Sequence, residues 1–431
     1  MSSFGFHTTS EEVASEFANQ IKGRTFLITG TSDGGLGAHV AITLAIHGPA
    51  ALILVSRTRA RTEPTIRKVH AVNPDVVVHF VQCELSDFDS VRSAAAAIHD
   101  LPVSKIDVLV NNAGVMALEK HTRDKQGYEL QLSSNHLGHF LLTNLIVAKV
   151  VAAGPGSRIV NVSSDGYRVS FFDFEDWNFS KGRAYHDLVA YGQSKTANIL
   201  FSVALAERFA GRGVVALSVH PGAVMSTGLV AHMQVDNLVD RLYEAALRTN
   251  GTQTFAAEPS EKTLSQGGAS LLAAALDPAF ERQSSAYIKD CKVVETLEYA
   301  HSPELAQRLW ELSEELVGDR FKQSTRASRS GTVNIPLLGT LTPTIPVLMP
   351  SPPTTLAGLS VIRARAITSR LALDWRRDLG GGDDVVEALG HGSRHGEAED
   401  EAQAAAAAQR FGQASAVAEA EAEVRMEEMA R

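Results

Sequence analysis

Short apolar runs alternate with amphipathic stretches from about residue 21 to residue 222. The apolar runs are rich in β-branched residues and show little alternation of polar and apolar positions, which is typical of strands buried on both faces of a parallel sheet. Six such runs predict strands at residues 25–30, 50–57, 76–85, 106–114, 157–164 and 214–222. A shorter run predicts a seventh strand at residues 285–293.

The stretches between these strands carry apolar residues three and four positions apart, which predicts helices. The expected helices cover residues 36–47, 87–98, 128–152, 190–210, 238–247, 261–276 and 302–318. Strands that alternate with helices predict an α/β fold with a doubly wound parallel sheet of about seven strands. The more polar residues 225–263 are expected either to close over a substrate or to form a surface loop.

The pattern changes after about residue 319. Residues 320–380 mix Ser, Thr, Pro and Arg without a stable period, and residues 397–431 are rich in Ala and Glu. Ala and Glu favour helix, but this stretch has no broad apolar face to bury. We therefore predict an N-terminal helical arm (1–20), a folded domain (21–318) and a largely disordered tail (319–431) that is locally helical near 397–431.

The composition argues against nucleic-acid binding, a disulfide framework and a metal site. The 431 residues include 40 Lys and Arg against 49 Asp and Glu, so the net charge is −9 and clustered cations for nucleic acid are not expected. Cys83 and Cys291 lie far apart and have no metal-ligand spacing, so we expect neither a disulfide framework nor a metal. No signal peptide and no membrane span is expected, and the cytoplasm is the predicted location.

A glycine-rich segment, ITGTSDGGLG, joins the first strand to the first helix. Gly30 would permit the tight turn, Gly34 or Gly35 would let the backbone approach a pyrophosphate, and Gly37 would let the helix pack closely on the sheet. A carboxylate about 20 residues further on marks sites that prefer NAD. Here that position is Arg57, which predicts NADP over NAD because a guanidinium can pair with a 2′-phosphate.

Several further motifs follow in order: CEL (83–85), NNAG (111–114), NHLGHF (135–140), IVNVSS (159–164), YGQSK (191–195) and HPG (220–222). Together with the glycine loop, the chain resembles the short-chain dehydrogenase/reductase family over residues 20–318. It is most similar to the branch of retinol dehydrogenases and the WW-domain oxidoreductase, and to their fungal members. The resemblance implies a Rossmann-type subunit, NAD(P) binding and carbonyl–alcohol chemistry.

The chain departs from the family pattern at two positions. Four residues instead of three separate Gly30 from Gly35, although Gly35, Leu36 and Gly37 match the end of the family's loop. Some fungal members are similar, which implies that cofactor binding is kept. Glu84 stands where the family has an aspartate that would accept a hydrogen bond from the adenine amine, and its extra methylene shifts that carboxylate by about a bond length.

Tyr191 and Lys195 are four residues apart on a predicted helix, so they share one face. A free tyrosine has a pKa near 10, and a neighbouring ammonium is expected to lower it by about 1–3 units. The resemblance implies that Tyr191 is the acid/base and that Lys195 also holds the nicotinamide ribose. Tyr167 and Tyr185 are alternatives, but neither has a lysine four residues later.

The resemblance assigns further roles along the sheet edge. Ser164 would bind the substrate oxygen, while strand alternation points Ser163 elsewhere. Asn135 would hold a water that links Lys195 to solvent, and His136 and His139 are expected to be packing residues. Other implied cofactor contacts are Asn112 and Gly114 at the adenine ribose and Val224 with Ser226, or alternatively Thr227, at the nicotinamide carboxamide.

These observations predict an NADP-dependent oxidoreductase acting on a small, partly apolar carbonyl or alcohol, in fungal secondary metabolism. The alternative from another class is a non-catalytic NADP-binding regulator or scaffold. An epimerase or dehydratase of the extended branch fits less well, because the region after Gly222 is small. The resemblance also implies a homodimer that pairs through the helices carrying Asn135 and Tyr191, with a monomer as the alternative.

Overall fold

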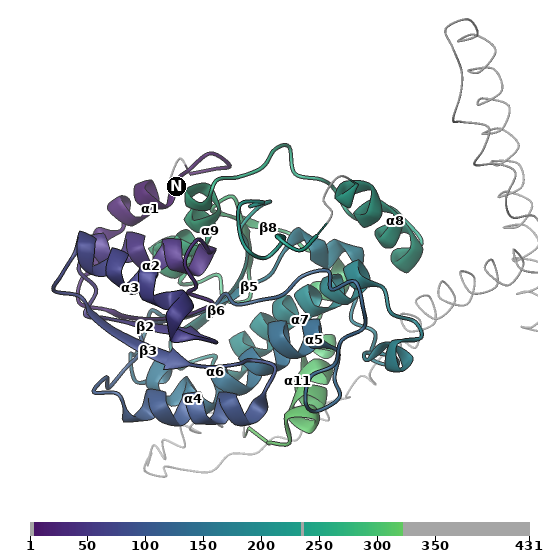
Figure 1. The fold of residues 1–431 in the computed structure, drawn as a ribbon, viewed down its shortest axis with the longest axis horizontal. Helices are drawn as coiled ribbons and strands as arrows, with labels where there is room; N and C mark the ends of the chain where they lie inside the picture. Colours follow the sequence, from purple (N-terminus) through teal and green to yellow (C-terminus); the bar gives the residue numbers. More distant parts are fainter. Residues whose placement is uncertain (1–3, 234–236, 322–431) are drawn as a thin grey trace, which may run out of the picture. The chain divides into compact units, whose positions relative to one another are not determined.

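The computed structural model describes residues 4–233 and 237–321 (Figure 1). Its eight strands form one sheet in the order β3-β2-β1-β4-β5-β6-β7-β8. The strands are β1 (Thr25–Thr29), β2 (Ala51–Ser56), β3 (Val77–Gln82), β4 (Val108–Asn111), β5 (Ser157–Val162), β6 (Val214–His220), β7 (Tyr287–Lys289) and β8 (Lys292–Val294). All neighbours pair in parallel except β7 and β8. The order and direction of the strands confirm the doubly wound Rossmann-type sheet.

The predicted seventh strand is a hairpin. Within residues 285–293 the chain reverses at Asp290 and Cys291, whose φ angles are 52° and 60°. Two consecutive residues in the left-handed region form the tight turn that joins antiparallel strands. The single strand expected there was wrong, because nothing in the apolar pattern marks a cysteine as a turn residue.

Helices cover both faces of the sheet (Figure 1). One layer packs into a common core and comprises α1 (Ser10–Glu16), α2 (Leu36–Ile46), α3 (Arg59–Val72) and α9 (Leu264–Leu276). The opposite layer comprises α4 (Phe88–Asp100), α6 (Gly138–Val151), α7 (Asp187–Arg208) and α11 (Pro303–Val317). The sequence pattern missed α3, which has Pro64 inside it and a charged first turn.

The N-terminal residues pack on the domain. Helix α1 begins with a capping box between Thr9 and Glu12, and it buries Val13 in the core. The Ser10 hydroxyl donates to the carbonyl of Ser265, 2.7 Å away. The helix expected within residues 1–20 is therefore a layer of the fold and not a separate arm.

Helix α11 closes the opposite layer. Ser302 caps its start and Gly318 ends it with a φ of 73°. Trp310 packs edge-on against Phe140 of α6, with ring centroids 4.9 Å apart, and also against Phe201 of α7. Helix α11 therefore packs along α7, one of the two helices through which we expected subunits to pair.

Packing continues past the expected boundary at residue 318. The ring of Phe321 lies 5.7 Å from that of Phe140, and its backbone N–H donates to Glu314 at 2.7 Å. The tail predicted at 319–431 and the helix predicted near 397–431 lie outside the described residues from residue 322 onward.

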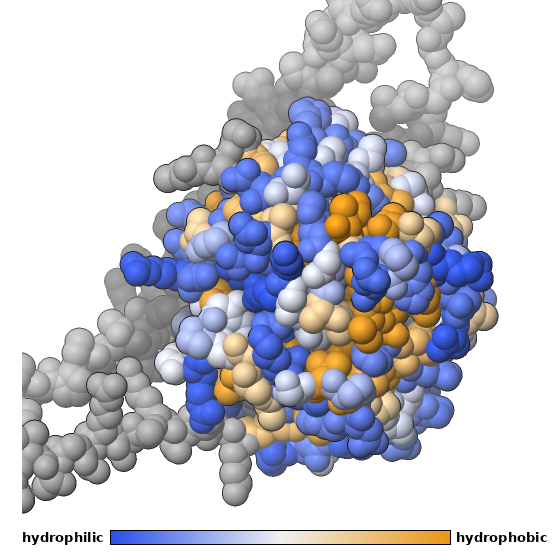
Figure 2. Space-filling model, turned by 90° about the vertical axis from the view of Figure 1, so that its left-hand side faces the viewer, coloured by the Kyte–Doolittle hydropathy of each residue, from blue (hydrophilic) through white to orange (hydrophobic). Residues whose placement is uncertain are grey.

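The side of the molecule that carries α3 and β3 is mostly hydrophilic, with one area where hydrophobic side chains gather (Figure 2). Exposed large hydrophobic residues from the elements on this side are Ile46, Val72 and Val77. Among the helices formed by residues 4–233 and 237–321, none is long and apolar enough to cross a membrane.

Candidate active site

The glycine loop forms a cradle between β1 and α2 that side chains would fill. Gly30 has a φ of +73°, and a Cβ there would lie 2.8 Å from the Cα of Ala113. A Cβ on Gly37 would lie 2.6 Å from Nδ2 of Asn112. That amide donates to the carbonyl of Thr29 at 2.7 Å, so Asn112 fastens the loop to the end of β4. Only glycine allows this close approach.

The backbone is accessible at the tip of the glycine loop, around Gly34 and Gly35. Gly34 has a φ of +75° and no atom near its added Cβ, whereas Gly35 is extended and caps α2, whose first residue is Leu36. No side chain caps this helix, so its first N–H groups face outward as an anion site does. The residues present therefore fit a dinucleotide pyrophosphate, with Gly34 at the turn and Gly35 and Leu36 at the helix end.

The glycine loop is tied to α3. The Asp33 carboxylate accepts from Lys68 at 2.6 Å, and its backbone N–H donates to the carbonyl of Arg61 at 2.9 Å. The Thr65 hydroxyl donates to the carbonyl of Thr31 at 3.0 Å. The longer loop is thus held by three bonds to one helix, which explains how it keeps a defined shape.

Arg57 and Glu84 lie together at the carboxyl ends of β2 and β3. The Arg57 side chain is 60% exposed and its Nε is 4.0 Å from Oε2 of Glu84. The other carboxylate oxygen of Glu84 accepts from the Ser86 hydroxyl at 2.9 Å. Arg57 is loosely held by one partner, so its guanidinium has donors left for a phosphate.

Tyr191 lies in the second turn of α7 and is buried. The backbone after β5 packs against the ring of Tyr191. A Cβ on Gly166 would lie 2.9 Å from Cε1 of Tyr191. Ser164 precedes this glycine, and its hydroxyl accepts the Gly166 N–H at 3.0 Å. Burial raises the pKa of Tyr191 to about 12, although a hydrogen bond with Ser164 acts in the opposite direction.

Lys195 lies one turn further along α7 and is equally buried. Its Nζ donates to the carbonyl of Val162 at 3.1 Å and lies 5.5 Å from the centroid of the Tyr191 ring. Burial lowers the pKa of Lys195 to about 8. One of its three N–H groups is used by Val162, and the remaining donors suit ribose hydroxyls.

The lowering of the Tyr191 pKa that we expected from Lys195 does not occur. The ammonium is bonded to the carbonyl of Val162 and lies 5.5 Å from the ring centroid, and burial has a larger effect on the pKa of Tyr191 than this cation has. Burial dominates instead and favours the neutral phenol. Without cofactor, Tyr191 therefore carries its proton.

Asn135 lies in a π-helical turn, Ser133–Leu137, that interrupts the predicted helix 128–152 between α5 (Leu130–Leu132) and α6. Its amide donates to the carbonyl of Val115 and to the hydroxyl of Ser194, both at 2.9 Å. Its Oδ1 accepts the N–H of Val115 at 2.8 Å. Such turns occur frequently at functional sites.

This geometry limits what Asn135 can do. Both amide N–H groups are used, so a water could bind only as a donor to the remaining acceptor position of Oδ1. A Cβ on Gly114 would lie 3.1 Å from that oxygen and 3.7 Å from Nζ of Lys195. Gly114 thus leaves open the space between Asn135 and Lys195.

Ser163, His136 and His139 form hydrogen bonds outside the space between Asn135 and Lys195. The Ser163 hydroxyl donates to the carbonyl of Lys195 at 2.8 Å, away from Ser164 as strand alternation predicts. His139 bridges the carbonyl of Asn135 and the hydroxyl of Thr29, at 3.0 and 2.9 Å. His136 bonds Ser313 of α11 at 2.8 Å. Both histidines are buried; His139 ties its helix to the end of β1, and His136 ties the π-helical turn to α11.

The stretch after β6 carries the last expected contacts. Val224 packs against α9, where a Cβ on Gly267 would lie 2.5 Å from its Cγ2. Ser226 is exposed, while the Thr227 hydroxyl donates to the carbonyl of Val224 at 3.3 Å. The Thr227 hydroxyl already donates a hydrogen bond within the chain, and the Ser226 side chain is exposed to solvent. Neither observation excludes a contact with the carboxamide, so both residues remain alternatives.

Comparisons with known proteins agree with these motifs. The family model for short chain dehydrogenases matches residues 24–237. Retinol dehydrogenase 14 of Mus musculus is 35% identical over 305 residues, which cover 69% of this chain and 86% of that protein. Oxidoreductase fscI of Fusarium equiseti is 37% identical over 240 residues, covering 50% of this chain and 93% of that protein. The chain belongs to the short-chain dehydrogenase/reductase family.

A solved structure has a similar fold. An uncharacterized protein from Mycobacterium Paratuberculosis aligns with a TM-score of 0.52 and 30% identity over 70% of this chain and 96% of that one. As a short-chain dehydrogenase/reductase, the protein is an oxidoreductase of the hydride-transfer type that binds NAD or NADP and acts on small molecules. The resemblance inferred from the motifs is confirmed.

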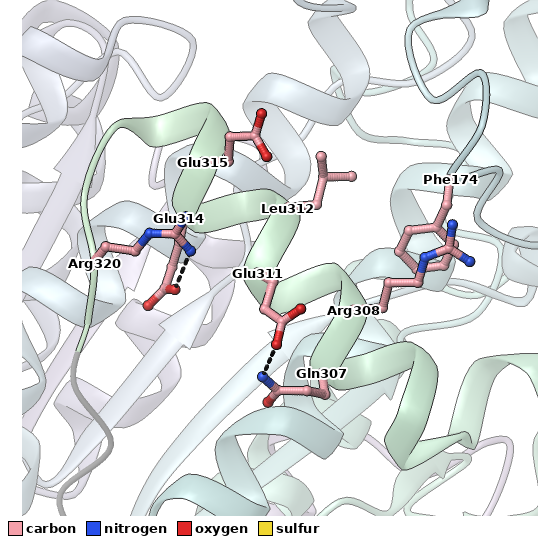
Figure 3. A pocket seen from close by; sticks show the side chains of 8 residues that line it. All are labelled: Phe174, Gln307, Arg308, Glu311, Leu312, Glu314, Glu315 and Arg320. Carbon is pink, nitrogen blue, oxygen red and sulfur yellow. Dashed lines mark hydrogen bonds and ion pairs between the residues drawn. The ribbon is translucent and has the colours of Figure 1, made fainter.

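A hollow of 580 Å³ lies elsewhere on this short-chain dehydrogenase/reductase, along α11 (Figure 3). Its polar side chains pair with one another: Gln307 donates to Glu311 at 2.7 Å, and Arg308 lies 4.4 Å from the ring centroid of Phe174. None of the predicted site residues lines this hollow. It is a groove between charged surface side chains and not the active site.

Proposed function

We propose that the protein transfers hydride between NADP(H) and a carbonyl or alcohol carbon of a small, partly apolar substrate, with Tyr191 as the acid/base. The observation that carries this proposal is the buried Tyr191 hydroxyl, which has Ser164 as its partner and Lys195 on the same helix face. The cofactor would supply the hydride, and this chain orients the reactants and moves the proton.

Each side chain has one role in carbonyl reduction. Ser164 donates a hydrogen bond to the substrate oxygen, since its own acceptor capacity is partly used by Gly166. Tyr191, neutral because burial raises its pKa to about 12, gives its proton to that oxygen as negative charge develops. Lys195 holds the ribose, and Asn135 fixes the turn of α7 through Ser194, which donates to the carbonyl of Tyr191 at 2.8 Å.

NADP is the cofactor that we propose, because Arg57 stands where a site for NAD would have a carboxylate. Its exposed guanidinium is loosely paired and can reach a 2′-phosphate without first leaving a buried partner. Gly30, Gly35, Leu36 and Gly37 would hold the pyrophosphate.

Apolar side chains around Tyr191 support the substrate class. Tyr191 belongs to a buried cluster with Met116 and Val169, and with Leu238 and Leu242 of helix α8 (Leu238–Asn250). Met225 and Phe255, from the chain on either side of α8, pack against this cluster. A carbonyl compound with an apolar body would bury that body here, at about 25 cal/mol per Å² of apolar surface.

Two finer predictions belong to this proposal. Secondary metabolism in a fungus remains our prediction, and the similarity to fscI of Fusarium equiseti is what favours it. Cytoplasmic location also remains a prediction, favoured by two free, buried cysteines. The alternative function, a non-catalytic NADP-binding regulator, is disfavoured because Tyr191 and Lys195 are both in place.

The test is NADPH oxidation by the full chain against a panel of carbonyl compounds, comparing wild type with Tyr191→Phe. We expect turnover to fall by about 100-fold or more, since the transferable proton is removed, with NADPH affinity nearly intact. Tyr185→Phe is the matched control, because its hydroxyl donates to the carbonyl of Leu118 and lies on the loop before α7. Near-normal turnover of Tyr191→Phe would overturn the assignment, and NADPH binding without reduction of any carbonyl compound would favour the regulator.

A further inference from the structure

Four charged or titratable side chains meet at the carboxyl ends of β5, β6 and β7. Asp165 follows Ser164, His220 ends β6, Lys289 ends β7, and Glu258 comes from the chain between α8 and α9. Nζ of Lys289 lies 2.7 Å from Oδ2 of Asp165 and 2.7 Å from Oε1 of Glu258. The Tyr287 hydroxyl donates to the other oxygen of Asp165 at 2.8 Å. None of these residues figured in the sequence-based site.

The cluster is not arranged as a metal site. Asp165, His220 and Glu258 have ligand atoms close enough to share an ion, but the ammonium of Lys289 already bridges the two carboxylates. Burial alone would raise the pKa of Glu258, yet hydrogen bonds from His220 and Lys289 outweigh it and lower that pKa to about 2. Both carboxylates are therefore ionised and paired with a cation of the chain itself.

The partners of His220 determine its tautomer. Nδ1 lies 3.2 Å from the backbone nitrogen of Asp165, an N–H that can only donate, so Nδ1 must accept. In a neutral imidazole the proton is then on Nε2, which lies 3.0 Å from Oε1 of Glu258 and donates to it. Glu258 thus fixes the ring so that its acceptor nitrogen faces the Asp165 N–H.

This bond lies next to the hydroxyl that our mechanism uses. Ser164 caps the turn Asp165–Val169, and its Oγ accepts the N–H of Gly166, one residue after the N–H held by His220. Two consecutive N–H groups therefore define the turn, one bound by Ser164 itself and one by His220. The ring of Tyr191 packs directly on Gly166, so a shift of this turn would displace Ser164 relative to Tyr191.

We propose that His220 is a positioning residue of the reaction, whose Nδ1 holds the Asp165 N–H and thereby fixes the Ser164 hydroxyl against Tyr191, while Glu258 orients the ring. The inference rests on the proposed function of Ser164. It assigns a role to a histidine outside the residues to which we give catalytic roles, and it gives Glu258 and its ion pair with Lys289 a part in orienting that ring.

Two substitutions separate the two bonds of His220. In His220→Asn the amide oxygen can take the place of Nδ1 and accept from Asp165, but the side chain no longer reaches Glu258. In His220→Gln the longer side chain places its amide near the position of Nε2 and reaches Glu258, but no acceptor remains for the Asp165 N–H. We expect kcat for carbonyl reduction to fall about 10- to 100-fold in His220→Gln and to recover to within about threefold of wild type in His220→Asn. The Kd for NADPH should stay within about twofold in both.

A double-substitution cycle tests whether the effect passes through Ser164. In a Ser164→Ala background, His220→Gln should cost little further activity, because the hydroxyl that His220 positions is already gone. Equal losses in the Asn and Gln variants, or a full additional loss in the Ser164→Ala background, would overturn the proposal.

Hydrogen exchange gives a readout that does not need activity. The peptide spanning residues 163–167 should exchange faster in His220→Gln than in wild type, whereas His220→Asn should stay protected. If no carbonyl is reduced by the wild type, the proposed function fails, but exchange still decides whether His220 holds the turn. Unchanged exchange in the Gln variant, with the fold intact by circular dichroism, would overturn the inference.

Discussion

Burial shifts the pKa values of Lys195 and Tyr191 in opposite directions, and both shifts favour the neutral form of the side chain. Burial lowers the pKa of Lys195 to about 8 and raises that of Tyr191 to about 12, because the charged form of each group loses its hydration. Tyr191 therefore holds its proton across the physiological range, while Lys195 is the group near Gly114 that titrates just above it.

We expect NADPH affinity to weaken as pH rises through about 8. Below that pH Lys195 is protonated and can donate to the ribose, and above it the ammonium must first be restored, so binding takes up a proton. The Kd, measured by nucleotide fluorescence between pH 7 and 9.5, should rise by up to about tenfold per pH unit above 8. Lys195→Met should bind more weakly and show a flat profile, and a wild-type Kd that is flat across this range would contradict the assignment.

Arg57→Asp should shift cofactor preference toward NADH. A carboxylate would repel the 2′-phosphate and could accept from a ribose hydroxyl, and loss of one charge-assisted bond is worth about 10- to 100-fold. The measurement is the ratio of kcat/KM for NADPH and NADH. Arg59→Asp is the control, because Arg59 is exposed and pairs with Glu63 at 3.2 Å. A ratio that does not move toward NADH would remove Arg57 as the 2′-phosphate contact.

At the scale of elements, the interruption of the predicted helix 128–152 shows where periodicity stops being informative. Apolar spacing continues through the π-helical turn Ser133–Leu137, so the pattern predicts one helix. The turn is held instead by contacts distant in sequence, namely Asn135 with Val115 and Ser194. Hydrogen bonds of this kind form between residues that are far apart in the sequence, and a single sequence does not show which of them come together in the fold.

Gly138 sets the distance between α6 and the chain after β3. A Cβ there would lie 2.2 Å from the carbonyl oxygen of Leu85, a backbone atom that cannot move aside. We expect Gly138→Ala to destabilise the protein by about 1–3 kcal/mol or more and to lower Tm by several degrees, in proportion. Gly228→Ala, where no atom lies within 4 Å of the added Cβ, should leave Tm nearly unchanged. Equal thermal denaturation curves for both variants would show that the helix can shift at no cost.

At the scale of the whole molecule, the sequence predicted the six long strands, their alternation with helices and the edge at which the site lies. Gly30 could be found from the strand–loop–helix pattern and Tyr191 from its helical spacing to Lys195, whereas the choice of Ser164 rested on the family resemblance. The hairpin at Asp290, helix α3 and the His220 cluster could not, because they depend on a turn of unusual composition, a helix with an internal proline and pairings between distant segments.

The carboxyl-terminal limit of the folded domain is the last feature at this scale. Beyond the predicted boundary at Gly318, Asp319 pairs with Arg92, and Arg92 also donates to the carbonyl of Val317 at 2.8 Å. Phe321 adds an aromatic contact to Phe140. These contacts fasten α11, which in turn packs along α7.

We therefore expect two truncations to differ. A chain that ends at Phe321 keeps all of these contacts and should bind NADPH with a Tm within a few degrees of the full chain, because residues 322–431 offer no sustained apolar face to bury. A chain that ends at Gly318 loses Asp319 and Phe321, a loss of about 1–2 kcal/mol, and its Tm should be lower by a few degrees. Differential scanning calorimetry and NADPH titration of both chains provide the comparison. Aggregation or lost cofactor binding in the chain ending at Phe321 would mean that residues 322–431 stabilise the domain, and would count against a domain complete at Phe321.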